Sequence, residues 1–344
     1  MSFIAHLLSN SGQKLHFRNI YLLKRILPSA TLINKHVDFL RKNGKCPGCG
    51  IFLGVNAANE RITAMHSLLL GLAAALAWGI HDLCVRFVSQ RTGILPAMLT
   101  VFASGAILVA AAAFAFGDWQ AMSLPAARLA GLSGAIFALA SYALYRAFAL
   151  GPVKLVAPLI GAYPVLSLGM AMLQGQPVGP GHWLAVAVVA GGIGCIAVFS
   201  TQEDGSPATL QAAAWGLAGA IGFALTFAAG QAATQAGAEL PVLIVTRLAA
   251  ILILLGLALL ARVVQLPGRQ VLPLLCLMGA LDAVALGLVI YSGTLPRPEF
   301  ASISASLFGL VTVVLAWLVL RESMNRAQWI SVAVTFGGIA YLGF

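Results

Sequence analysis

Ten apolar segments, each long enough to cross a lipid bilayer, follow one another between residues 67 and 344. An α-helix rises about 1.5 Å per residue, so roughly 20 apolar residues cross the hydrocarbon layer of about 30 Å. The predicted spans are 67–88, 95–116, 127–149, 153–173, 182–200, 210–232, 240–262, 271–293, 300–320 and 328–344. Glycine, proline and charged residues separate them. The sequence therefore predicts an all-α membrane protein with ten transmembrane helices.

The composition and the distribution of charge agree with this class. Hydrophobic residues make up 60% of the chain and charged residues only 9%, compared with about 25% charged residues in soluble domains. The formal net charge is +10, but nine of the 20 lysine and arginine residues lie in residues 1–64. Because the positive charge is concentrated in this tail, it does not indicate a nucleic-acid partner.

Two interpretations of the basic tail, residues 1–64, are open. Its mixed basic and apolar residues could form an amphipathic helix on an anionic lipid surface. We prefer the second interpretation, in which Met65 is the biological start and the tail is a non-native upstream extension. The tail also contains Cys46 and Cys49 in a CxxC pattern, but no second pair accompanies them. We therefore predict neither a metal site nor a cofactor.

The ten spans are two copies of a five-span unit, predicted at residues 65–200 and 206–344. At an offset of 146 residues the pairs are Tyr145 with Tyr291, Pro152 with Pro298, Trp183 with Trp329, Gly191-Gly192 with Gly337-Gly338, and Gln176 with Glu322. At an offset of 145, Trp78 meets Phe223. Because five is odd, the second copy enters the membrane from the opposite side. Inverted repeats can present one midplane site to either side in turn, although a duplication can also simply build a stable bundle.

The sequence resembles the EamA-type ten-helix transporters of the drug/metabolite transporter superfamily over about residues 66–344. The resemblance is carried by Arg146–Val153, Val156–Leu159, Tyr163–Leu166, Gly175-Gln176-Pro177, Gly191-Gly192, Leu320–Ser323, Gln328-Trp329 and Gly337-Gly338. Gln176 departs from the glutamate that is usual in the first copy, whereas Glu322 keeps it in the second. The resemblance implies a multi-pass secondary carrier of the bacterial inner membrane, often an exporter of amino acids, small metabolites or drugs.

Asp282 lies near the middle of the eighth span. An ionisable side chain at this depth is costly unless it is paired or hydrated, so it is a candidate functional residue. It could bind substrate and carry the coupling proton from one side of the membrane to the other. The alternative is a structural ion pair, with Arg247 of the seventh span as partner.

Trp78, Asp82 and Arg86 share one face of the first helix, since they are four residues apart. One interpretation is a local Asp82–Arg86 salt bridge near the interface. The other places Asp82 at the pocket mouth, with Trp78 as an aromatic wall, to bind a cationic or amine-bearing ligand. Neighbouring His81 is a further titratable candidate.

The remaining candidates are Tyr142 of the third span, Tyr163 of the fourth and Ser304 of the ninth, which we expect to line the substrate site. Pro164 removes an amide donor within the fourth span and is the predicted hinge.

The predicted function is secondary-active transport of a small molecule by alternating access, with export as the preferred direction. The alternative is a non-transporting membrane scaffold or sensor, and a membrane-embedded enzyme is the weaker alternative. Phosphate-loop, HExxH and GxSxG motifs are absent from the sequence, so it offers no support for nucleotide hydrolysis or for these catalytic chemistries. The expected partners are a small-molecule substrate and the lipid bilayer, with a homodimer as an open possibility.

Overall fold

The computed structural model describes residues 49–173, 179–204, 207–263, 266–295 and 298–341. Residues 60–344 form one compact unit, to which the following description refers. Residues 1–59 form a separate unit, of which only the start of the first described helix is included. The predicted surface helix, Cys46 and Gln176 therefore lie outside the described residues.

Each of the ten predicted spans has a helical counterpart in the described part of the chain, where no strand occurs. Eight helical segments are long and apolar enough to cross a membrane, and shorter apolar helices complete the set. The helices are α4 (Cys49–Ser89), α5 (Ile94–Phe116), α6 (Leu124–Leu150), α7 (Val153–Gly161), α8 (Tyr163–Leu173), α9 (Pro180–Asp204), α10 (Pro207–Gln235), α11 (Glu239–Leu260), α12 (Leu272–Tyr291), α13 (Pro298–Ala305), α14 (Phe308–Leu315) and α15 (Arg326–Tyr341), with the short turns η1 (Trp119–Ala121), η2 (Ser292–Thr294) and η3 (Ala316–Leu320). The predicted all-α membrane class is confirmed.

The fourth and ninth predicted spans are each broken into two helices. The fourth is interrupted at Ala162, between α7 and α8, and Pro164 lies in the first turn of α8. The ninth is interrupted at Ser306 and Leu307, between α13 and α14, where no proline occurs. There the Ser306 hydroxyl donates to the carbonyl of Ile303 at 2.6 Å, a type of bond that bends helices. Ala162 and Leu307 correspond at the 145-residue offset, so the break is repeated.

Two close helix crossings are also repeated, and they exchange partners between the copies. A Cβ atom at Gly134 of α6 would overlap the backbone of Thr246 in α11, and one at Gly279 of α12 would overlap the backbone of Val101 in α5. Gly279 and Thr246 are the 145-residue counterparts of Gly134 and Val101. A contact that pairs each residue with the counterpart of its partner is typical of a two-fold relationship.

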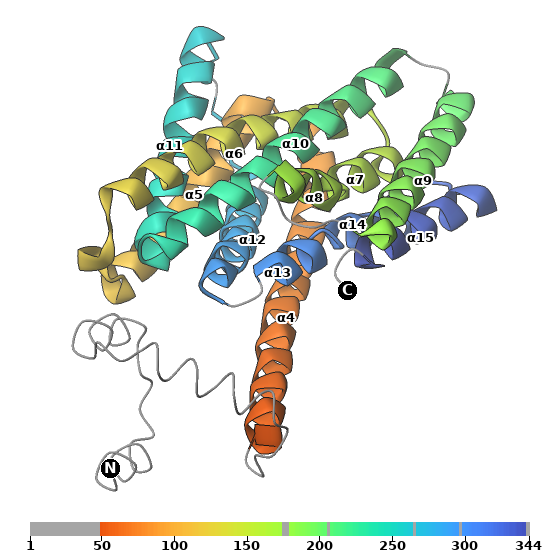
Figure 1. The fold of residues 1–344 in the computed structure, drawn as a ribbon. Coiled ribbons are helices and arrows are strands. Elements are labelled where there is room, and N and C mark those ends of the chain that lie inside the picture. Colours follow the sequence, from red (N-terminus) through yellow and green to blue (C-terminus); the bar gives the residue numbers. More distant parts are fainter. Residues whose placement is uncertain (1–48, 174–178, 205–206, 264–265, 296–297, 342–344) are drawn as a thin grey trace, which may run out of the picture. The chain divides into compact units, whose positions relative to one another are not determined.

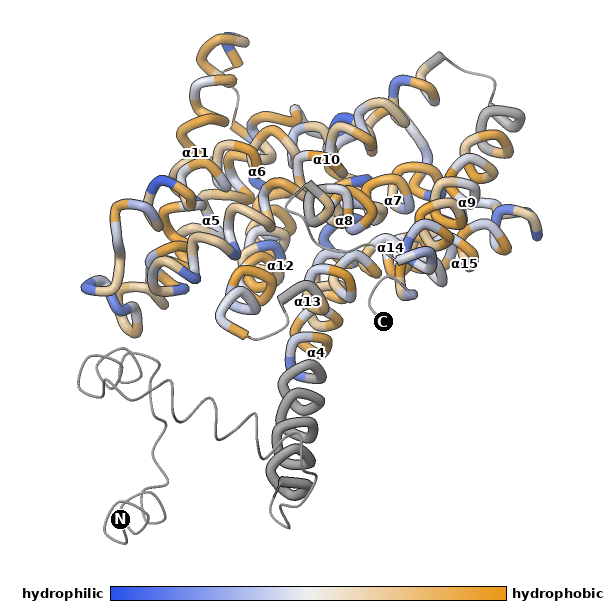
Figure 2. The backbone as a smooth tube through the Cα atoms, in the orientation of Figure 1, coloured by the Kyte–Doolittle hydropathy of each residue, from blue (hydrophilic) through white to orange (hydrophobic). Residues whose placement is uncertain are grey.

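The hydrophobic residues cover the outside of the helices as well as the core. Figure 2 shows apolar residues along the full length of the helices, with hydrophilic residues mainly near their ends and connections. Large side chains such as Ile107, Leu210 and Leu252 are exposed. Such a surface suits lipid rather than water, because lipid tails are as apolar as these side chains.

Helices of the two copies pack directly against one another, including the last helix of each copy. Helix α10 packs along α6 and α7, whereas α9 packs against α15 (Figure 1). Gly192 of α9 meets the hydroxyl of Thr335, and Gly338 of α15 faces Val188 and Val189. These two glycines therefore let α9 and α15 approach closely within one chain.

Candidate functional site

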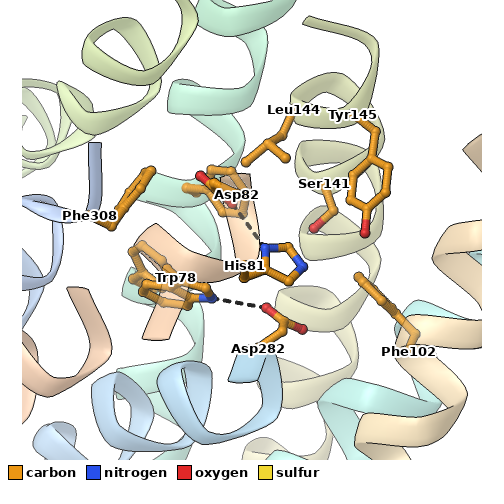
Figure 3. A pocket seen from close by; sticks show the side chains of 11 residues that line it. Trp78, His81, Asp82, Phe102, Ser141, Leu144, Tyr145, Asp282 and Phe308 are labelled. Carbon is orange, nitrogen blue, oxygen red and sulfur yellow. Dashed lines mark hydrogen bonds and ion pairs between the residues drawn. The ribbon is translucent and has the colours of Figure 1, made fainter. Parts of the chain in front are cut away.

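A small pocket lies between helices of both copies. Its volume is about 20 Å³, enough for a single water molecule. Eleven side chains line it (Figure 3): Trp78, His81 and Asp82 from α4, Phe102 from α5, Ser141, Leu144 and Tyr145 from α6, Phe223 and Phe227 from α10, Asp282 from α12 and Phe308 from α14. In the described ranges, no group of three His, Cys, Asp or Glu side chains is placed to hold a metal ion.

Helix α4 supplies three of the lining side chains because their spacing puts them on one face. Trp78, His81 and Asp82 are three and four residues apart, which brings their side chains to the same side of the helix. All three are buried. Gly79, on the same helix, permits a close approach to α14, since a Cβ atom there would lie 2.6 Å from Cβ of Val311.

The Asp282 carboxylate has a partner on each oxygen. Trp78 Nε1 donates to Oδ1 at 3.0 Å, and Arg247 Nη1 donates to Oδ2 in a buried ion pair. The Arg247 guanidinium also lies 5.6 Å from the ring centre of Phe102 and 5.3 Å from that of Phe137. The structure thus contains the Asp282–Arg247 pair that was one of the two sequence interpretations.

The Asp82 carboxylate, by contrast, has one oxygen without a partner. Its Oδ1 lies 3.0 Å from His81 Nδ1, whereas its Oδ2 has no hydrogen-bond partner among the described residues. His81 Nε2 and the Tyr145 hydroxyl are likewise buried without a partner in this part of the chain. Because buried polar groups are nearly always hydrogen-bonded, this cluster suggests a place where a ligand or water binds.

The predicted Asp82–Arg86 salt bridge is wrong. Arg86 Nη1 instead donates to the carbonyl of Phe148 and, at 2.9 Å, to that of Gly151. These carbonyls lie at the end of α6, where the last turn has unsatisfied acceptors and partial negative charge. The sequence spacing alone could not predict this competing partner, because it comes from another helix.

Neither Tyr163 nor Ser304 lines the pocket. The Tyr163 hydroxyl donates to the Ser302 carbonyl, and the Tyr163 ring is 5.0 Å from that of Phe227, which lines the pocket. The Ser304 Oγ lies 3.1 Å from the Leu68 carbonyl oxygen and links α13 to α4. The structure thus brings Trp78, Asp82 and Asp282 together, places Tyr163 against the pocket-lining Phe227, and leaves Ser304 outside the pocket lining.

Tyr142 lies elsewhere. It borders a groove of about 560 Å³ lined by residues of α5, α6, α10 and α11. Its ring is 5.9 Å from that of Trp215, which borders the same groove. The groove is a place separate from the pocket of Trp78, Asp82 and Asp282.

Sequence reasoning missed the aromatic side chains contributed by α10 and α14. At the 145-residue offset, Phe223 corresponds to Trp78, Phe227 to Asp82, and Phe308 to Tyr163. The recognised pairing of Trp78 with Phe223 was the available signal, because a two-fold arrangement places both members of a pair at the same distance from the axis, so a central position for Trp78 implies one for Phe223. The pocket is built from matching positions of the two copies.

The two copies differ in chemistry behind this pocket. Phe102 and Phe137 stack with ring centres 5.1 Å apart, and at the 145-residue offset these positions hold Arg247 and Asp282. The same pair of sites therefore carries an aromatic stack in one copy and an ion pair in the other. Matching positions of the two copies therefore differ in charge at this site.

A second polar junction joins the copies at the start of α7. The Glu322 carboxylate accepts from the backbone N–H groups of Val153 at 3.1 Å and Lys154 at 3.3 Å. Lys154 Nζ donates to the Ser323 carbonyl at 3.1 Å. Glu322 thereby caps the first turn of α7, whose amide groups have no partner within the helix. At the 146-residue offset, the counterparts of Glu322 and Lys154 are Gln176 and Phe300, so the sequence does not repeat this chemistry.

We expect the Glu322→Ala substitution to lower the free energy of unfolding by about 0.5–2 kcal/mol, the usual range for a lost helix cap. Thermal unfolding in detergent micelles measures the change. Glu239→Ala is the matched control, because Glu239 lies in the first turn of α11 but caps no helix of the other copy. Equal effects of the two substitutions would contradict the proposed role of Glu322.

Comparisons with known proteins agree with this architecture. The model of the EamA-like transporter family matches residues 65–198 and again residues 210–344. A solved structure described as "Crystal structure of protein" has a similar fold, with a TM-score of 0.60 and 19% sequence identity, covering 80% of this chain and 97% of that chain. No curated protein matches the sequence. The two family matches confirm the resemblance seen in the sequence, and the chain belongs to the EamA-like transporter family.

Proposed function

We propose that the protein is a secondary-active carrier that moves a small molecule across the membrane by alternating access, with the central pocket as its substrate site. The observation that carries the proposal is a pocket built by both copies that buries two carboxylates, Asp82 and Asp282. A volume of about 20 Å³ excludes a metabolite in this conformation. Substrate entry therefore requires the two copies to move apart at the pocket.

The proposed motion rests on two inverted repeats, 65–200 and 206–344. The reciprocal contacts of Gly134 and Gly279 support a two-fold axis, and an odd number of spans in each copy makes that axis lie in the membrane plane. Exchange of the two copies' conformations would then open the pocket to the other side. The same arrangement supports transport over the scaffold or sensor alternative, which needs no such pocket.

The paired helix breaks fit this motion. Interrupted helices flank substrate sites in inverted-repeat carriers and free backbone groups for polar contacts. In this chain the breaks follow Gly161 and Ala305, next to Tyr163, which packs on the pocket-lining Phe227, and next to Phe308, which lines the pocket itself. Pro164, in the first turn of α8, is the proposed hinge on the first copy.

Asp282 is the proposed proton-coupling residue, with the proton or solute gradient as the energy source. Protonation of its carboxylate would weaken the bonds from Trp78 and Arg247, and thereby couple the proton to the contact between α4, α11 and α12. Export across the inner membrane is the proposed direction, as the sequence resemblance implies. Membership of a transporter family argues against an enzyme. The proposal also includes a homodimer. Gly191 on α9 and Gly337 on α15 face open space, which leaves room there for a helix of a second copy.

The test is transport by the full chain in liposomes, with a panel of radiolabelled amino acids, amines and drugs. We expect flux of at least one class, and at least a tenfold loss in the Asp282→Asn variant. Asp118→Asn is the control, since Asp118 is exposed and caps only the η1 turn. Flux unchanged by Asp282→Asn would contradict its role, and a folded protein that moves no panel member would favour the scaffold.

A separate measurement tests proton coupling without a variant. Substrate addition to weakly buffered proteoliposomes should change the internal pH when flux occurs. Flux without any pH change would remove the proton from the mechanism and leave a solute gradient as the driving force.

A further inference from the structure

The free oxygen of Asp82 is one of three polar groups of the pocket, with His81 Nε2 and the Tyr145 hydroxyl, that have no hydrogen-bond partner among the described residues. Asp82 is 2% exposed and lines the pocket, and its Oδ2 has no hydrogen-bond partner among the described residues. An ionised carboxylate can only accept hydrogen bonds. A group that binds Asp82 in its ionised form must therefore donate.

The balance of charge around the pocket points to a cation. Arg247 neutralises Asp282 through their ion pair and does not line the pocket. His81 Nδ1 lies 3.0 Å from Asp82 Oδ1. When the imidazole is neutral, no pocket-lining side chain among the described residues carries a positive charge that could balance an ionised Asp82. An anionic ligand would meet this carboxylate without a free cation, and a neutral ligand would leave its charge buried and uncompensated, which is costly.

The walls around Asp82 are aromatic. The Trp78 ring lies 5.4 Å from that of Phe227 and 6.1 Å from that of Phe308, and Phe223 stacks on Phe227 at 6.0 Å. The faces of aromatic rings attract cations, most strongly when water is excluded. The Tyr145 hydroxyl, also without a partner in the described chain, lines the same pocket (Figure 3) and is a second polar group available to a ligand there.

We propose that the pocket, in the opened conformation that substrate entry requires, binds a positively charged amine with an apolar body, whose ammonium group donates to Asp82 Oδ2 beside the rings of Trp78, Phe227 and Phe308. The amine is the recognised chemistry, and the aromatic walls hold the rest of the molecule. This inference deepens the proposed function by naming the class of substrate. Binding itself can be measured without transport, so the two proposals are separable.

The experiment compares three probes of similar size and different charge: phenethylamine, phenethyl alcohol and 3-phenylpropionate. Each is titrated into the full chain in detergent micelles by isothermal titration calorimetry. A charge-assisted hydrogen bond predicts that the amine binds about tenfold or more tightly than the alcohol or the carboxylate. The absence of amine binding, or equal binding of all three probes, would overturn the proposal.

Two variants assign the effect to this site. Asp82→Asn should weaken amine binding about tenfold or more, with the binding of phenethyl alcohol nearly unchanged. Tyr145→Phe, which keeps the ring and the packing, should weaken amine binding by a smaller factor. Asp118→Asn is the charge-matched control. Amine binding that survives both pocket substitutions would place the cation elsewhere and refute the proposal.

Liposome flux distinguishes failure of this inference from failure of the proposed function. An amine that binds through Asp82 but is never transported would contradict carrier function and leave the cation site intact. Transport of an anion at a rate that Asp82→Asn does not change would support carrier function and overturn the cation site.

Discussion

Adding one methyl group at Gly134 or Gly279 is expected to destabilise the protein by about 1–3 kcal/mol or more, the cost of overpacking a close contact. At Gly134 the new Cβ atom would overlap the carbonyl oxygen of Thr246, and at Gly279 that of Val101. Backbone atoms cannot rotate away as a side chain can, so α6 must separate from α11, and α12 from α5. Thermal unfolding of Gly134→Ala and Gly279→Ala in detergent micelles measures the loss.

Gly131→Ala provides the matched control on the same helix. Nothing lies within 4 Å of a Cβ atom at Gly131, so that substitution should be neutral or slightly stabilising, because alanine favours a helix by up to about 1 kcal/mol over glycine. The two effects therefore have opposite signs. Similar unfolding temperatures for Gly131→Ala and Gly134→Ala would refute the close crossing, and unequal losses at Gly134 and Gly279 would weaken the two-fold interpretation.

The second large effect is expected at the Arg247–Asp282 pair. Removing one partner of a buried pair leaves an uncompensated charge, which costs about 3–5 kcal/mol. Arg247 has no exposed surface, so water cannot compensate. We expect Arg247→Met to reduce the free energy of unfolding by this amount, as measured in detergent micelles.

The double variant Arg247→Met with Asp282→Leu separates stability from function. Replacing both charges with apolar side chains often restores stability, and the first copy already has apolar Phe102 and Phe137 at the matching positions. We therefore expect the double variant to regain most of the stability that Arg247→Met loses, while transport stays abolished. A double variant that transports like the original protein would show that the pair serves only the fold.

The sequence predicts the helices because a helix that crosses the bilayer must be apolar and about 20 residues long, and this requirement applies to each segment separately. The break beside Pro164 is visible for the same local reason, since proline lacks an amide donor. The matching break at Ser306 and Leu307 has no such residue. It becomes predictable only when the 145-residue offset is applied to the first break.

The pocket is less accessible to sequence reasoning because its contacts join distant helices. The Asp282–Arg247 pair could be proposed, since a charge in the membrane needs a partner. The partner of Arg86 could not be proposed from the sequence. The carbonyls of Phe148 and Gly151 compete with Asp82 for the Arg86 guanidinium only after α4 and α6 have packed. Tyr142 shows the same limit, since its position on α6 does not reveal which face of that helix meets the pocket.

The most direct test of the account is the orientation of the two copies in the membrane. Gln120 lies between α5 and α6, and Gly268 lies in the corresponding connection between α11 and α12; both are exposed. Single Gln120→Cys and Gly268→Cys variants, made after replacing the five native cysteines, are labelled in intact cells with a membrane-impermeant thiol reagent. The account predicts that the reagent reaches one of these cysteines from outside and the other only after the membrane is permeabilised. Labelling of both from the same side would contradict the inverted repeats and, with them, alternating access about the central pocket.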